Sequence, residues 1–358
     1  NASAVGGLTI DGEFVVSLSV TTAANSYSIT ASSNATSSAT GGGTVSAAYQ
    51  INVGNPFAVP IEGWGASSWG SGAWNVGESS TTAIRFFSQS NFGEDLIFGN
   101  NGGSIFYWDA TGSVTTRAVL LSTLSGASDV PVVQNLILVS DISRFVFCFG
   151  TNEIGSDTID PTLLRWSDQE DATNWTPSAT NQAGSLRLSR GTKIVAASQA
   201  RQEVLVWTDS SLYSLQYVGA PAVWAATLVG ENISISSQNA VAYANGVAYW
   251  MGKDKFYMYD GRTQPLKCDV RKYIFNDFNT AQYSQVFSGT NESFHEVWWF
   301  YCSDGETNID KYVIYNYLDK IWYYGTLART AWLDSGLRDS PLAATYTLNL
   351  VDHESGVD

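Results

Sequence analysis

The side chains best suited to chemistry are three carboxylates in one short stretch, Asp168, Glu170 and Asp171. Glycoside hydrolases use two such carboxylates, one as an acid and the other as a base or nucleophile. Asp side chains in turns also accept hydrogen bonds from nearby backbone N–H groups, which is a structural role. Because the chain has 33 acidic residues, clusters of this kind are expected on turns. We therefore predict a structured acidic turn and no catalytic residue, with glycan hydrolysis as an alternative.

Other catalytic and cofactor chemistry has no support in the sequence. The two histidines, His295 and His353, lack the spacing of a metal site, and GxSxG, GxGxxG and Walker motifs are absent. Three widely separated cysteines are expected to be buried free thiols: Cys148, Cys268 and Cys302. We expect no cofactor, no metal and no enzyme activity.

The composition indicates an all-β protein with many tight turns. Only 14% of the residues are charged, whereas 13% are aromatic and 32 are glycine. The formal net charge of −15 argues against general binding to the phosphate backbone of nucleic acids. No apolar run reaches the ~18 residues of a membrane span. The first residues do not resemble a signal peptide, and we expect the chain to be a piece of a longer protein.

Residues 1–55 predict a small β module of short strands, with an Asp11-Gly12 hairpin turn and an end at Asn55-Pro56. A glycine-rich loop follows at 63–75 and carries Trp64, Trp69 and Trp74. We expect these tryptophans to form an interface with neighbouring protein surface, and a sugar-binding aromatic platform is the alternative.

From about residue 83 the chain repeats a unit of an apolar strand, a turn, and a second strand that ends in aromatic residues and Asp or Asn. The aromatic anchors lie 58, 47, 44 and 58 positions apart: Trp108, Trp166, Tyr213, Tyr257 and Tyr315. Four-stranded propeller blades take roughly 40–50 residues. We predict a β-propeller of five to six degenerate blades over residues 56–358, incomplete at both ends. The last unit is expected at 346–358, and the best short helix at 269–280.

Several segments of the chain resemble one protein family when they are taken in order. They are WSDQEDATNWTP at 166–177, AGSL at 183–186, IVAA at 194–197, LVWTDSSLYSLQYVG at 205–219, VAYWMGKDKFYMYDG at 247–261, EVWWFYCSDG at 296–305 and ARTAWLDSG at 328–336, with GLTIDGEFVV at 7–16 and GWGASSWGSGAWN at 63–75. The chain resembles the tail nozzle, or packaged-DNA stabilisation, proteins of short-tailed bacteriophages.

The resemblance implies a structural virion protein, with six propeller-based subunits in a ring that retains and then conducts the genome. Adaptor, fibre and needle proteins of the tail are the implied partners, DNA passes without sequence-specific contacts, and no enzyme activity is implied. We expect the acidic loop of Asp168, Glu170 and Asp171 to face the channel. The alternative function is a carbohydrate-binding or host-receptor-recognition β-propeller.

Overall fold

The computed structural model describes residues 84–354 without a gap. Before them it describes residues 4–10, 12, 14, 16–17, 28–31, 33–41, 43, 54–58, 62–63 and 78–79. The chain divides into two compact units, Asn1–Asn52 and Val53–Asp358. In the first unit, β1 (Val16–Ser17) pairs antiparallel with β2 (Ser28–Ile29). The predicted Asp11-Gly12 hairpin and the loop with Trp64, Trp69 and Trp74 lie outside the described residues.

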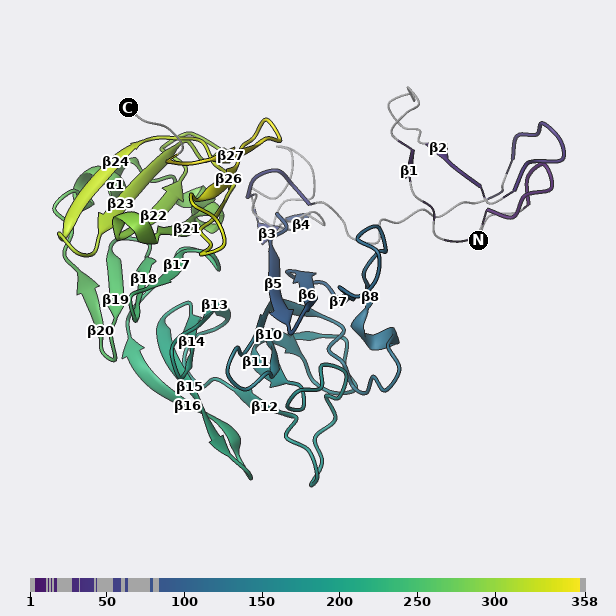
Figure 1. Ribbon diagram of the computed structural model, residues 1–358, viewed down its shortest axis with the longest axis horizontal. Helices are drawn as coiled ribbons and strands as arrows, with labels where there is room; N and C mark the ends of the chain where they lie inside the picture. Colours follow the sequence, from purple (N-terminus) through teal and green to yellow (C-terminus); the bar gives the residue numbers. More distant parts are fainter. Residues whose placement is uncertain are drawn as a thin grey trace. The chain divides into compact units, whose positions relative to one another are not determined.

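The second unit is a six-bladed β-propeller, as the sequence predicts. In blades 1 to 5 four antiparallel strands follow one another from the inner to the outer edge, and the sheets succeed each other around an axis (Figure 1). Blade 1 contains β5 (Phe87–Phe92), β6 (Asp95–Asn100), β7 (Ile105–Trp108) and β8 (Val119–Leu120). Blade 2 contains β9 (Gln134–Val139), β10 (Val146–Asn152), β11 (Ile159–Trp166) and β12 (Gly184–Arg187). Blade 3 contains β13 (Ile194–Gln199), β14 (Val204–Thr208), β15 (Ser211–Gly219) and β16 (Val223–Glu231).

The later blades continue the pattern. Blade 4 contains β17 (Val241–Ala244), β18 (Val247–Met251), β19 (Phe256–Tyr259) and β20 (Thr263–Leu266). Blade 5 contains β21 (Phe287–Asn291), β22 (Glu296–Tyr301), β23 (Lys311–Asn316) and β24 (Ile321–Thr326). In the described part of the chain blade 6 has three strands, β25 (Ala331–Leu333), β26 (Leu342–Ala344) and β27 (Leu350–Asp352). A separate short pair joins β3 (Glu62–Gly63) to β4 (Glu78–Ser79).

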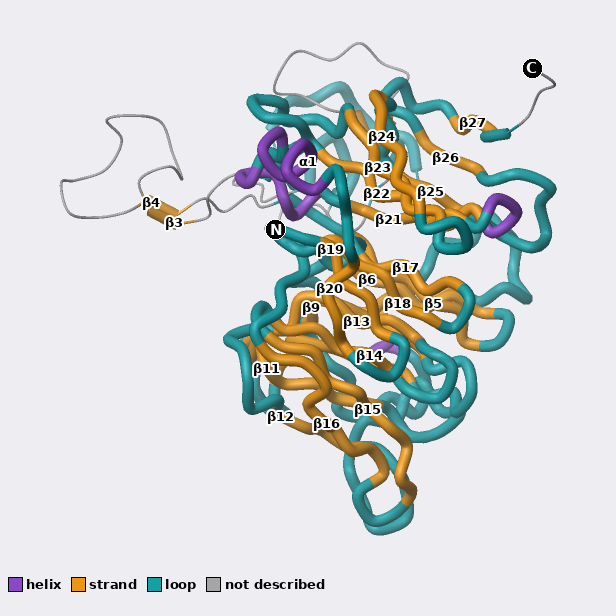
Figure 2. The backbone as a smooth tube through the Cα atoms, turned by 90° about the vertical axis from the view of Figure 1, so that its left-hand side faces the viewer, coloured by secondary structure: helices purple, strands orange, loops and turns teal. Residues whose placement is uncertain are grey.

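Helices are few in the described part of the chain, and all but one 3₁₀ turn within blade 5 lie between blades (Figure 2). The chain between blades 4 and 5 forms α1 (Arg271–Asp277) and the 3₁₀ turn η2 (Thr280–Gln285), which confirms the predicted short helix. Two further 3₁₀ turns are η1 (Leu121–Thr123) and η3 (Glu292–Phe294). None of the helices in the described part of the chain has the length and hydrophobicity needed to span a bilayer.

The repeating units of the sequence are the middle two strands of each blade. All five aromatic anchors lie on the third strand of blades 1 to 5, which are β7, β11, β15, β19 and β23. The sixth unit was misplaced: the structure begins blade 6 at Ala331, not at residue 346. Its strands have three residues each, too few for a clear hydrophobic alternation.

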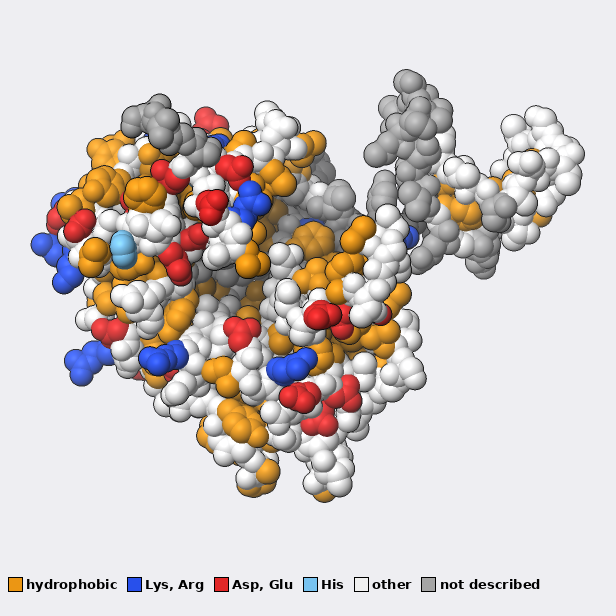
Figure 3. Space-filling model, viewed as in Figure 1, with side chains coloured by type: hydrophobic (Ala, Val, Ile, Leu, Met, Phe, Trp, Pro, Cys, Tyr) orange, Lys and Arg blue, Asp and Glu red, His pale blue; other side chains and the backbone are white. Residues whose placement is uncertain are grey.

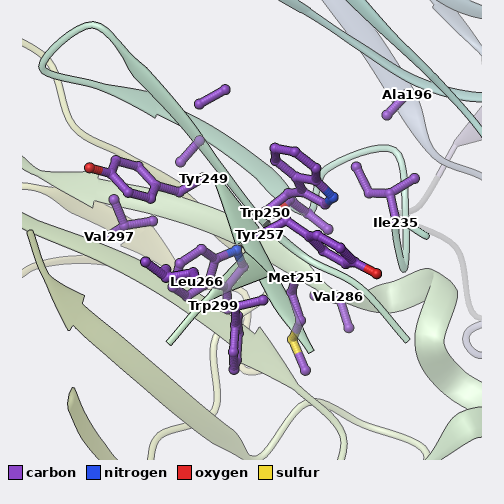
Figure 4. Packing of buried hydrophobic residues seen from close by; sticks show 14 of the residues in the cluster. Ala196, Ile235, Tyr249, Trp250, Met251, Tyr257, Leu266, Val286, Val297 and Trp299 are labelled. Atoms are coloured by element: carbon purple, nitrogen blue, oxygen red, sulfur yellow. Dashed lines mark hydrogen bonds between the residues drawn. The ribbon is translucent and has the colours of Figure 1, made fainter. Parts of the chain in front are cut away.

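Aromatic side chains from successive blades fill the space between them, which is where the sequence predicts the core. Trp250 stacks on Tyr257 at a ring-centroid distance of 5.3 Å and meets Trp207 of blade 3 edge-on at the same distance. On the other side of blade 4, Trp299 lies 5.0 Å from Phe256, and its indole N–H donates to Ala240 O at 2.9 Å. Figure 4 shows Trp250, Tyr257 and Trp299 among the buried side chains of this cluster. Rings this large, fully removed from water, dominate the hydrophobic stabilisation of such a fold.

The inner strands meet near the axis and connect the blades to one another. Asn239, just before β17, forms a parallel bridge with Phe287 of β21, so neighbouring inner strands run in the same direction. Gln238 Nε2 reaches Phe87 O at 3.5 Å, joining blade 4 to blade 1. These two blades lie opposite each other in a six-bladed ring, so this contact spans the centre of the propeller.

Candidate functional site

The three carboxylates singled out in the sequence lie in the connection between β11 and β12 of blade 2. The Asp168 carboxylate accepts hydrogen bonds from the backbone N–H groups of Gln169 at 2.9 Å and Gln182 at 2.8 Å. The Asp171 carboxylate accepts from Thr173 N at 2.9 Å and Thr173 Oγ1 at 2.7 Å. Glu170 is exposed and has a left-handed backbone, with φ of 59°.

Two of these carboxylates therefore hold the loop together, in the turn-capping role that the sequence predicts. The hydrogen bonds that Oδ1 of each carboxylate accepts within the loop support this role. Whether the loop faces a channel between subunits is a question of assembly, and that placement stays a prediction.

The cysteines are free, as predicted, but only Cys148 and Cys302 are buried, whereas Cys268 is half-buried. Burial raises the pKa of the Cys302 and Cys268 thiols to about 12. Their thiolate forms are therefore suppressed. His295 is exposed at the end of η3, whereas His353 Nε2 accepts a hydrogen bond from Arg329 Nε at 3.0 Å. Within residues 84–354 and the shorter described stretches, no His, Cys, Asp and Glu side chains group as a metal site.

A cavity of about 550 Å³ opens where the turns between the first two strands of blades 2, 3 and 4 converge. We refer to it as the turn cavity. It is lined by Asp141, Ile142, Gln199, Ala200, Arg201, Tyr243, Asn245 and Gly246. Because neighbouring inner strands run in the same direction, these three turns lie at the same end of the propeller.

Local sequence explains the shape of each turn. The turn between β17 and β18 consists of Asn245 and Gly246, both with positive φ (49° and 80°), as two-residue hairpin loops require. The turn between β13 and β14 is closed by Ala200 N donating to Glu203 O at 2.9 Å. Arg201 N then donates to Tyr243 Oη at 3.2 Å and links the turns of blades 3 and 4.

A second cavity, of about 360 Å³, lies beside Arg165 in blade 2. Arg165 is only 2% exposed, and its guanidinium donates to Asp129 O at 2.6 Å and Asn152 O at 3.3 Å and lies over the Trp175 ring. Burial lowers the pKa of Arg165 below its ordinary value. The Arg165 guanidinium thus contacts two backbone carbonyls and one aromatic ring, each from a different segment. These contacts indicate that Arg165 cross-links the loops around it.

The outer edge of blade 5 exposes apolar and aromatic side chains. Strand β24 and its neighbours leave five of them between 45% and 64% exposed: Tyr273, Leu318, Ile321, Tyr323 and Tyr324. We refer to these residues as the β24 surface. The rings of Tyr273 and Tyr324 lie 4.6 Å apart and connect α1 to β24, whereas Tyr323 alternates with Tyr324 along the strand and lies on the other face of the sheet.

A second exposed apolar area lies at the projecting end of the β15–β16 hairpin, where Tyr217 is 45% and Val218 is 53% exposed (Figure 3). Sequence reasoning missed the turn cavity, because its residues are ordinary turn residues in three separate repeats. It also missed the β24 surface, because an apolar run in a strand does not show whether a neighbouring blade covers it.

No protein-family model and no curated protein matches the chain. Among solved structures, it is similar to Hsv2p from Kluyveromyces lactis, with 12% identity, a TM-score of 0.42 and coverage of 76% of this chain and 75% of that chain. It is similar to the dihydro-heme d1 dehydrogenase NirN, with 11% identity, a TM-score of 0.44 and coverage of 76% and 53%. A puromycin hydrolase gives 10% identity, a TM-score of 0.43 and coverage of 72% and 42%. Similarity at this level assigns no function to the chain.

Proposed function

We propose that this protein is a structural subunit of a bacteriophage tail, in the nozzle or hub. Six copies form a ring that retains the packaged genome, conducts it at ejection and connects the adaptor, fibre and needle proteins. The protein performs no chemistry in this role. The proposal rests on the ordered segments that resemble tail nozzle proteins. It also rests on two properties of the propeller, its exposed apolar surface and the contact across its centre.

The observation that carries the proposal is the β24 surface. It presents Tyr273, Tyr323 and Tyr324, each about half exposed, on the outermost strand of a blade and the helix beside it. Exposed apolar areas of this kind usually mark protein interfaces. Tyrosine is also enriched at interfaces, because its ring supplies contact area and its hydroxyl a hydrogen bond. A subunit of a multi-protein assembly needs such a surface.

Charge and the narrow propeller centre support the same assignment. A net charge of −15 per chain repels DNA, which suits a conduit through which a genome must slide. The contact between Gln238 and Phe87 joins opposite blades, so a duplex would not thread a single propeller. The conduit would then lie between subunits of the ring, with the acidic loop at Asp168–Asp171 as a candidate for its lining.

Electron cryo-microscopy of the virus particles assembled from the genome that encodes this chain tests the proposal. We expect six copies around the tail axis, with the β24 surface or the loop of Trp64, Trp69 and Trp74 against neighbouring protein. Absence of the chain from the particle, a single axial copy, or a lumen lined by Lys and Arg would refute it. A position at the tip of a fibre would instead favour host-receptor recognition.

A further inference from the structure

We propose that the turn cavity binds a neutral saccharide of one or two rings. The cavity has a volume of about 550 Å³, within the range of about 300–1,000 Å³ typical of small-ligand pockets. Its walls come from three successive blades, so the ligand would contact blades 2, 3 and 4 together. The site does not depend on the proposed role in a virion.

Polar side chains around the cavity have hydrogen-bonding capacity that the protein does not use. In the described part of the chain, the Asp141 carboxylate and the Arg201 guanidinium form no ion pair. Tyr243 Oη accepts from Arg201 N, which leaves the phenol proton free to be donated. Donors and acceptors thus face one space, as the hydroxyl groups of a sugar require.

The apolar groups and the charge balance narrow the ligand class. The Tyr243 ring and Ile142 give the cavity an apolar side against which the C–H face of a sugar ring can pack. The charges of the Asp141 carboxylate and the Arg201 guanidinium cancel, so the cavity favours neither a phosphate nor a polycation. A lipid chain in the cavity would separate the polar groups from water without replacing their hydrogen bonds. The polar lining therefore excludes lipids as ligands. A neutral saccharide satisfies both the polar and the apolar side.

Part of the site is held in place before any ligand binds. Gln199 Nε2 donates to Ala200 O at 2.7 Å and to Glu203 O at 3.3 Å, which holds the turn of blade 3 in shape. The bond between Arg201 N and Tyr243 Oη fixes the turn of blade 3 against β17. Preorganised polar groups lower the entropic cost of binding.

The test is a binding measurement on the whole chain by saturation-transfer NMR and calorimetry. The probes are galactose, N-acetylglucosamine, lactose and di-N-acetylchitobiose. We expect at least one to bind with a Kd of about 1 mM or tighter. Asp141→Ala and Arg201→Ala each remove an exposed side chain and should raise that Kd about tenfold, the effect of losing a charged hydrogen bond. Asp319→Ala, in the exposed turn between β23 and β24, is the matched control and should leave the Kd unchanged.

Ile142→Trp provides a second variant that keeps every polar group but fills the cavity from an exposed position, and it should abolish binding. The proposal is overturned if none of the four probes binds. It is equally overturned if binding persists at full strength in Ile142→Trp and in both alanine variants, because the saccharide would then sit elsewhere. Circular dichroism of each variant shows that a lost signal is not lost folding.

Discussion

At the scale of single residues, the Asp168 carboxylate joins two distant points of one loop. It accepts from Gln169 and from Gln182, which lies 14 positions further along the chain. Asp168→Ala leaves both N–H groups without this acceptor and should lower the free energy of unfolding by about 1–2 kcal/mol. Glu170→Ala, at an exposed position whose side chain forms no hydrogen bond in the described part of the chain, should change it by less than about 0.5 kcal/mol.

Urea denaturation followed by tryptophan fluorescence measures both variants. Equal effects of Asp168→Ala and Glu170→Ala would contradict the capping role. A loss of ring assembly in Glu170→Ala without a loss of stability would instead place that side chain in an interface.

His353 gives the stability of blade 6 a dependence on pH. Burial, and then the Arg329 guanidinium that donates to its Nε2, hold the pKa of His353 below its ordinary 6.5. The His353 imidazole therefore binds a proton more readily in the unfolded chain than in the folded chain. The stabilisation is complete above about pH 6.5 and is lost as the pH falls below it. We expect the free energy of unfolding to fall from pH 7.5 to pH 5.5, and His353→Gln to remove this part of the slope.

A second group near His353 acts in the opposite direction. Burial raises the pKa of Glu296, and Glu354 beside His353 adds to the rise. The folded chain therefore holds a proton on Glu296 more readily than the unfolded chain, and its contribution is lost as the pH rises above 4.5. Glu296→Gln separates the two effects. A pH profile that is unchanged in His353→Gln would show that His353 does not control the acid response.

At the scale of elements, the Trp332 side chain helps to dock blade 6 on blade 5. Trp332 of β25 stacks on Trp298 at 5.0 Å, and its indole N–H donates to Thr290 O at 2.7 Å. A Cβ at Gly289 of β21 would lie 2.2 Å from the Trp332 ring. Gly289→Ala should therefore push the ring out of place and lower the free energy of unfolding by about 1–3 kcal/mol.

The matched control is Gly336→Ala, since a Cβ there meets nothing within 4 Å. It should be neutral within about 0.5 kcal/mol. Urea denaturation of both variants checks the difference, and near-ultraviolet circular dichroism reports the Trp332 environment. An unperturbed spectrum in Gly289→Ala would mean that the contact is looser than it stands in the structure.

The elements also show which strands of a blade can be predicted from the sequence. The second and third strands are continuous apolar runs, such as β18 and β19, because both faces of these strands are covered by neighbouring blades. The outer strands are shorter or half exposed, as in β8 and β24, so their patterns are weak. For this reason the middle strands were predictable and the outer ones were not.

At the scale of the whole molecule, net charge decides how the protein meets DNA. A chain with a charge of −15 releases few counterions on contact with a duplex and gains little by binding it. We expect labelled duplex DNA to show no change in fluorescence anisotropy with about 10 μM protein at about 0.15 M salt. Binding that weakens as salt is added would reveal a basic surface able to grip DNA, and would contradict the passive conduit proposed for the ring.

Local sequence patterns predict the all-β class, the propeller, the short helix at α1 and the capping role of Asp168 and Asp171. Each of these depends on residues close together in the chain: a buried strand, a capped turn or a repeat of about 50 residues. Such patterns keep their physical meaning wherever the segment lies in the fold.

Only the tertiary structure decided the start of blade 6, the exposure of the β24 surface and the turn cavity. The cavity residues Asp141, Arg201 and Tyr243 stand in three different repeats, where each is an unremarkable turn or strand residue. They share one space because the inner strands of successive blades run in the same direction around one axis. The exposure of Tyr324 likewise depends on the neighbouring blades, because the sequence of a β-strand does not show which of its faces those blades will cover.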